Sequence, residues 1–132
     1  MTERPLSPHL SVYRMSRYTL LTSILNRGTG LVLSAGLILL VYWLVAVASG
    51  AAAYRDARTV LSLGVLKAFY IILLATFSYH LFAGIRHLIW DTGHGLERAQ
   101  SKRSAALVVT CSILLFVGLV WWASLHAGAR AP

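Results

Sequence analysis

The stretch LSLGVLKAFYIILLATFSYHLFAGIRHLIWD, residues 61–91, decides the fold of this chain. Its first half is almost entirely apolar, and His80 follows within the same run, ahead of Arg86 and His87. A helix needs about 20 predominantly apolar residues to cross a bilayer, so this stretch is long enough. An ionisable side chain at membrane depth is costly and usually faces a protein interior. We therefore expect a transmembrane helix in which His80 marks a functional site.

Two further apolar runs of similar length flank this one. They read LVLSAGLILLVYWLVAVAS at residues 31–49 and AALVVTCSILLFVGLVWWASL at residues 105–125. With 58% hydrophobic residues and only four acidic side chains in 132 residues, the chain leaves no room for a separate soluble domain. The sequence predicts one all-α integral membrane domain over 1–132. Its three transmembrane helices should run up, down and up, over about 22–49, 59–90 and 102–126.

The basic residues set the expected orientation in the membrane. The net charge is +8, but the basic residues lie mostly outside the apolar runs, so we read no nucleic-acid binding from it. Basic residues favour the cytoplasmic side, which places the N-terminus and the second link there and the C-terminus on the periplasmic side of a bacterial inner membrane. The residues that decide this are listed here by segment: Arg4, Arg14, Arg17 and Arg27 before the first span, and Arg86, Arg98, Lys102 and Arg103 around the second link. The first link carries only Arg55 and Arg58, which Asp56 partly offsets.

Residues 1–21 form a polar lead-in ahead of the first span. Pro5 and Pro8 favour an irregular or extended start. The following stretch HLSVYRMSRY mixes aromatic residues with arginines, which suits an interfacial segment or a docking arm for a partner. A solvated cytoplasmic tail is the alternative.

His80 has the surroundings expected of a haem ligand. His80, Gly84 and His87 are spaced i, i+4 and i+7, so they share one face of a helix. Gly84 leaves that face without a side chain one turn from His80, and a flat macrocycle would lie there against the backbone. Imidazole is a common axial ligand of haem iron. The alternative is a buried histidine that forms a hydrogen bond to another helix.

A second histidine of this chain cannot complete the axial pair. His80 and His87 are about 10.5 Å apart along a helix, whereas two axial nitrogens on one iron lie about 4 Å apart. The other histidines are not expected at membrane depth, since His9 and His94 should be cytoplasmic and His126 lies at the far end of the last span. A bis-histidine haem therefore needs its other ligand from a second polypeptide, and a thin three-helix bundle needs partner helices to bury a histidine. His87 would reach a haem propionate or face lipid headgroups. Arg86 is expected to snorkel at the interface, with a propionate or lipid phosphate contact as the alternative.

A second polar cluster opens the first span, in the sequence TSILNRGTG at residues 22–30. Ser23 and Arg27 are spaced i and i+4, with Asn26 beside Arg27. A hydroxyl and a fixed cation near the membrane surface would hold a quinone carbonyl or stabilise charge on a quinone being reduced. Arg27 would equally pair with a haem propionate. The alternative is a helix capped by Thr22 or Ser23 with one arginine at the cytoplasmic boundary.

Three motifs together resemble a known family. They are RPLSPHLSVY at residues 4–13, SILNRGTG at 23–30 and HLFAGIRHLIWD at 80–91. In order and placement they are similar to the cytochrome b membrane anchor of succinate dehydrogenase (succinate:quinone oxidoreductase), the larger of its two anchors. The resemblance implies that His80 is an axial ligand of haem b and that the other small anchor supplies the second histidine. It also implies that Ser23 and Arg27 line the ubiquinone site, with Arg27 near the propionates.

The resemblance also implies what the chain lacks. Flavin and iron–sulfur clusters would belong to a flavoprotein subunit and an iron–sulfur subunit, since this chain has one cysteine and no dinucleotide-binding loop. We therefore expect no catalytic residue here, but a lipid-embedded anchor that shares haem b and helps form the ubiquinone site. The alternatives are a haem-free structural anchor and a small transporter subunit that uses His80 as a proton relay.

Overall fold

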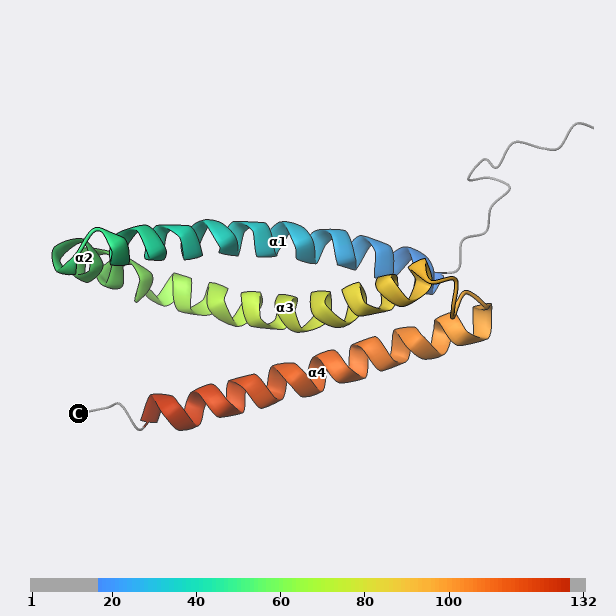
Figure 1. The fold of residues 1–132 in the computed structure, drawn as a ribbon. Coiled ribbons are helices and arrows are strands. Elements are labelled where there is room, and N and C mark those ends of the chain that lie inside the picture. Colours follow the sequence, from blue (N-terminus) through green and yellow to red (C-terminus); the bar gives the residue numbers. More distant parts are fainter. Residues whose placement is uncertain (1–16, 129–132) are drawn as a thin grey trace, which may run out of the picture.

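The computed structural model describes residues 17–128, which form four helices (Figure 1). They are α1 (Arg17–Ala48), α2 (Ala51–Leu61), α3 (Gly64–Asp91) and α4 (Arg98–Gly128). Three of them contain a segment long and apolar enough to cross a membrane, namely Leu20–Ala48, Gly64–Asp91 and Arg98–His126. The expected all-α, three-span architecture is confirmed. The docking arm and the motif at 4–13 lie outside the described residues.

The three long helices form a layer with α3 in the middle (Figure 1). α3 runs antiparallel to both neighbours and packs along each of them, whereas α1 and α4 touch little. In the most apolar 18-residue segment of each span, only 6% of α1 and 17% of α3 and of α4 is buried within the chain. Most of the apolar surface therefore faces outward, where lipid or further transmembrane helices must cover it.

The second expected helix, 59–90, is wrong at its start. Residues 51–61 form the separate helix α2, and the membrane span begins only at Gly64. Leu63 has an extended ψ of 141° and breaks the helix, and the hydroxyl of Tyr70 donates to the Leu61 carbonyl oxygen (3.2 Å) at the end of α2. At the other end of α2, Gly50 has a φ of +101°, which an L side chain rarely adopts, and the chain reverses there.

The helices α1 and α4 also begin earlier than expected. α1 begins at Arg17 rather than near residue 22, and α4 begins at Arg98 rather than near 102. Thr22 and Ser23 thus lie inside α1, and the expectation that either caps the helix is wrong. The turn predicted between α3 and α4 is present, with Gly93 and Gly95 at φ values of +80° and +78°.

Glycines bring α1 close to α3 along the membrane span. A Cβ atom added to Gly36 would lie 2.5 Å from Cδ2 of Leu73, so the leucine occupies the space that a side chain would need. A Cβ added to Gly30, two turns nearer the N-terminus, would lie 3.5 Å from Cε1 of His80. Small residues commonly permit such close helix contacts in membranes. Here Gly30 lets the His80 ring lie against the backbone of α1.

Candidate functional site

His80 points from α3 towards α1. Its Nδ1 lies 3.0 Å from the hydroxyl oxygen of Thr29, and this hydroxyl in turn donates to the Asn26 carbonyl oxygen at 2.9 Å. The histidine is half-buried. The hydrogen bond across two helices, foreseen as one alternative, is therefore present, and it leaves the other ring nitrogen available. Thr29 belongs to a cluster that the sequence singled out, but its role was missed.

The other ring nitrogen of His80 has the freedom that a metal ligand needs. Among residues 17–128, Nε2 of His80 makes no hydrogen bond. One turn along α3, a Cβ added to Gly84 would meet nothing within 4 Å, so the space beside the helix is open there. An unpaired imidazole nitrogen beside an uncovered stretch of backbone fits one axial haem ligand with the macrocycle lying against Gly84.

His87 does not join His80 in one ligand set. It lies seven residues further along α3, about 10.5 Å along the axis. Its ring packs edge-on against Trp90, with a centroid separation of 5.4 Å. Within residues 17–128, no three His, Cys, Asp or Glu side chains come together as metal ligands. Residues 17–128 therefore offer no second protein ligand to an iron held by His80.

Arg86 lies on the other side of α3 and faces α4. Only 6% of it is exposed, so the expectation that it snorkels at the interface is wrong. Its Nε donates to the Ser104 hydroxyl (3.0 Å), and one terminal nitrogen donates to the carbonyl and hydroxyl oxygens of Ser101 (3.0 and 3.1 Å). The guanidinium also lies 4.0 Å from the ring centroid of Trp90. The geometry therefore does not support a propionate contact, because the guanidinium already forms hydrogen bonds that connect α3 to α4.

Replacing Arg86 by lysine should loosen this junction without changing the haem. A lysine ammonium cannot reproduce the planar fork, and hydrogen bonds to charged groups contribute about 1.5–3 kcal/mol each. We expect a clear drop in the thermal midpoint of the purified complex, whereas exposed Arg103→Lys on α4 should leave it unchanged. A shifted haem spectrum at unchanged thermal stability would instead indicate that Arg86 contacts the haem.

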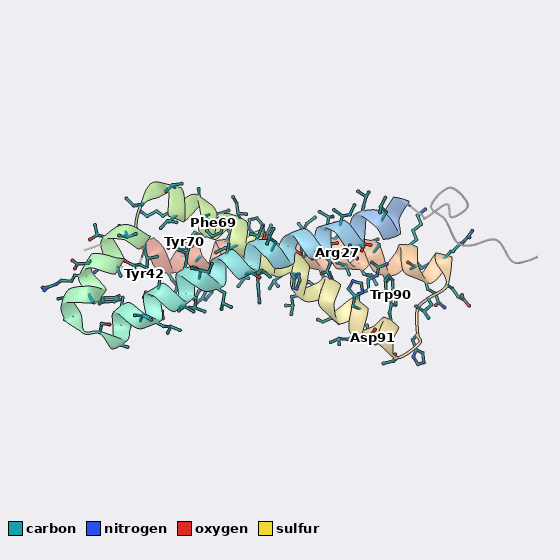
Figure 2. The ribbon with its side chains drawn as sticks, turned by 90° about the horizontal axis from the view of Figure 1, so that it is seen from above. Arg27, Tyr42, Phe69, Tyr70, Trp90 and Asp91 are labelled. Atoms are coloured by element: carbon teal, nitrogen blue, oxygen red, sulfur yellow. The ribbon has the colours of Figure 1, made fainter. Side chains whose placement is uncertain are left out.

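Arg27 lies on α1 towards the same end as Trp90 of α3 (Figure 2), and Ser23 precedes it by four residues on the same helix. Because α1 and α3 are antiparallel and Thr29 faces His80, Ser23 falls about 9 Å nearer this end than the histidine. Arg27 is exposed and Ser23 is half-buried, and neither has a hydrogen bond or ion pair within residues 17–128. Beside them, the buried side-chain oxygen Oδ1 of Asn26 also lacks a partner there. This end of α1 therefore presents polar groups that are free to bind a ligand.

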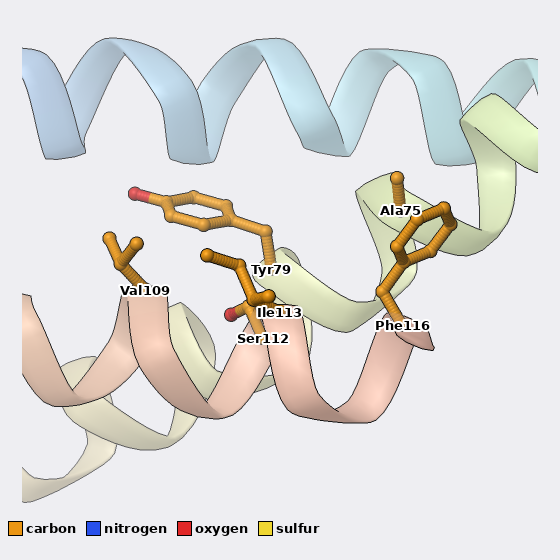
Figure 3. A pocket seen from close by; sticks show the side chains of 6 residues that line it. All are labelled: Ala75, Tyr79, Val109, Ser112, Ile113 and Phe116. Atoms are coloured by element: carbon orange, nitrogen blue, oxygen red, sulfur yellow. The ribbon is translucent and has the colours of Figure 1, made fainter. Parts of the chain in front are cut away.

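A separate cleft of about 200 Å³ lies between α3 and α4 (Figure 3). None of its lining residues belongs to the candidate site. The Tyr79 hydroxyl is buried without a hydrogen-bond partner among residues 17–128. The cleft is lined by Ala75, Tyr79, Val109, Ser112, Ile113 and Phe116.

Comparisons with known proteins show which proteins this chain is similar to. A family model described as succinate dehydrogenase/fumarate reductase transmembrane subunit matches residues 1–126. The succinate dehydrogenase cytochrome b556 subunit of Paracoccus denitrificans is 42% identical over 119 residues, covering 86% of this chain and 87% of the relative. That of Rickettsia felis is 35% identical over 119 residues, covering 90% and 91%. The mitochondrial cytochrome b560 subunit of Bos taurus is 37% identical over 118 residues, covering 88% and 69%.

Proposed function

Because the chain belongs to the family of succinate dehydrogenase/fumarate reductase transmembrane subunits, we propose that His80 is the axial ligand it gives to haem b. The chain is a three-span cytochrome b membrane-anchor subunit of succinate dehydrogenase and not its catalytic flavoprotein. The family and its anchoring role are shared with the relatives described above.

The single observation that carries the proposal is the state of the His80 ring. One nitrogen is held by Thr29, the other has no partner within residues 17–128, and Gly84 leaves open space beside it. Relatives named cytochromes b556 and b560 support haem b as the group bound. When bound, the haem supplies a one-electron redox centre inside the membrane. The role of this chain is to hold that group in place and to exclude water from it.

The second axial histidine comes from the other small anchor subunit. The spacing of His80 and His87 rules out a pair from one helix. The largely uncovered faces of the three spans leave room for partner helices. The cytoplasmic ends of these spans carry the iron–sulfur and flavoprotein subunits in this proposal, with the chain in a bacterial inner membrane and its N-terminus in the cytoplasm. His87, at that end of α3, lies towards the haem propionates.

Ser23 and Arg27 bind the quinone at the cytoplasmic end of α1. The Ser23 hydroxyl donates to one quinone carbonyl oxygen. The Arg27 guanidinium stabilises the negative charge that develops on that oxygen as electrons arrive from the iron–sulfur subunit. Two observations support these roles. Neither side chain has a partner within residues 17–128, and both lie on one side of the helix. Ubiquinone is the substrate that the family likeness favours.

An optical spectrum of the intact complex tests this proposal. The complex, purified through a tag on this chain, should contain haem b at one copy per copy of the chain. Its reduced-minus-oxidised difference spectrum should show b-type bands. A complex that holds the flavoprotein and iron–sulfur subunits but no haem would indicate a haem-free anchor. A chain that purifies with neither would favour the proton-relay transporter.

A further inference from the structure

We infer that Thr29 is a positioning residue whose hydroxyl oxygen accepts a hydrogen bond from Nδ1–H of His80 and so fixes the tautomer that leaves Nε2 for the iron. The inference rests on the proposed ligation of haem by His80. Thr29 lies on α1, a different helix from the ligand, and contacts Nδ1, the ring nitrogen that does not bind the iron in this proposal.

The direction of the hydrogen bond follows from counting protons. A threonine hydroxyl carries one proton and two lone pairs. The Thr29 hydroxyl donates its proton to the Asn26 carbonyl oxygen at 2.9 Å, so it offers His80 only a lone pair. Nδ1 of His80, at 3.0 Å, must then be the donor. A neutral imidazole with its proton on Nδ1 has its free lone pair on Nε2, the nitrogen without a partner among residues 17–128.

The position of the acceptor is fixed by the local helix. Threonine is β-branched, and the bond from its hydroxyl to the carbonyl three residues earlier selects its χ1 rotamer. Gly30, next in sequence, lets the His80 ring lie against α1, where a Cβ would be 3.5 Å from Cε1. The hydroxyl oxygen therefore sits at a defined point in front of Nδ1. The hydrogen bond therefore sets the rotation of the His80 ring about its Cβ–Cγ bond as well as its tautomer.

A hydrogen bond on the outer nitrogen also changes the ligand's electronic character. Donation from Nδ1–H raises the basicity of the coordinating nitrogen, and such outer contacts are worth about 10-fold to 100-fold in metal affinity. A more basic ligand stabilises ferric over ferrous iron. Loss of the Thr29 hydroxyl should therefore raise the haem midpoint potential, loosen the haem and release the ring orientation.

The experiment compares Thr29→Val with Thr29→Ser in the whole membrane complex. Valine keeps the shape and removes the hydroxyl, whereas serine keeps the hydroxyl. Ser34→Ala is the matched control, because Ser34 lies on the same helix but is exposed and donates only to the Gly30 carbonyl oxygen (2.9 Å). The readouts are the haem midpoint potential, the electron paramagnetic resonance signal of the ferric haem and the rate of haem transfer to apomyoglobin.

Thr29→Val should raise the midpoint potential by up to about 59 mV, which is a tenfold change in a one-electron equilibrium. It should shift the ferric resonance and speed haem transfer about tenfold. Thr29→Ser and Ser34→Ala should match the unaltered complex. If valine does not assemble, Thr29→Ala serves in its place, because it removes the hydroxyl with less bulk beside Gly30.

Two results overturn the inference. A hydroxyl-free variant that matches the unaltered complex in all three readouts shows that the hydrogen bond does not act on the haem. Equal changes in the serine and valine variants show that packing, not the hydroxyl, matters. A parallel His80→Ala complex separates this inference from the proposed function. If His80→Ala loses its haem while Thr29→Val is unchanged, only the role of Thr29 fails; if His80→Ala keeps a normal haem, the ligand assignment fails.

Discussion

Replacing His80 by alanine should strip haem b from the assembled complex. In the proposed ligation the histidine supplies one of two axial bonds, so its loss would leave the iron with a single protein ligand. Losing an outer contact alone costs about 10-fold to 100-fold in affinity, so losing the ligand itself should exceed that range. We expect little or no haem per chain in the pyridine haemochrome assay. Any haem that remains should give a high-spin spectrum.

Two controls separate ligation from misassembly. His94→Ala changes a histidine in the exposed turn after α3, where its one hydrogen-bond partner among residues 17–128 is the Thr92 hydroxyl (2.9 Å), and should keep full haem. Electron transfer from succinate to a soluble dye should persist in both variants, since the flavoprotein remains attached. An unchanged low-spin spectrum in the His80→Ala complex would show that the iron has another ligand.

The spans were predictable from sequence because the bilayer imposes a length. Each apolar run is long enough to cross, and within residues 17–128 each one became a helix that qualifies as a span. The break before Gly64 was not predictable in the same way. The apolar run continues through Leu61 and Leu63, and its pattern did not predict the extended backbone at Leu63. The carbonyl left free at the end of α2 receives the Tyr70 hydroxyl from the next helix, a tertiary contact.

The candidate site was only partly predictable from the sequence, because some of its contacts join different helices. The depth and spacing of His80 mark it within one helix, so a linear pattern reveals it. Arg86 was misread because an arginine near a tryptophan at the end of a span is typical of an interface residue. Its acceptors, Ser101 and Ser104, lie 15 and 18 residues away on α4. Thr29 was missed for a similar reason, because it meets His80 across 51 residues of chain.

Replacing Arg27 by alanine should slow quinone reduction far more than it slows succinate oxidation. The guanidinium is exposed on α1 with no partner among residues 17–128, so its removal breaks no described contact in the fold. A hydrogen bond from a charged donor contributes about 1.5–3 kcal/mol, and each 1.4 kcal/mol is a factor of ten. We therefore expect kcat/KM for a soluble quinone to fall about 10-fold to 100-fold.

The diagnostic quantity is the ratio of two rates measured on one preparation. Electron transfer from succinate to a dye that accepts electrons upstream of the quinone should change by less than about twofold in Arg27→Ala, and Arg27→Lys should recover part of the quinone rate because it keeps the charge. Arg103→Ala removes an exposed cation near the start of α4, so it is the matched control and should leave both rates unchanged. Ser23→Ala should add less than its separate effect when combined with Arg27→Ala, since both side chains would act on one bound quinone. Equal losses in the two assays would instead mean that Arg27 holds the soluble subunits on the membrane.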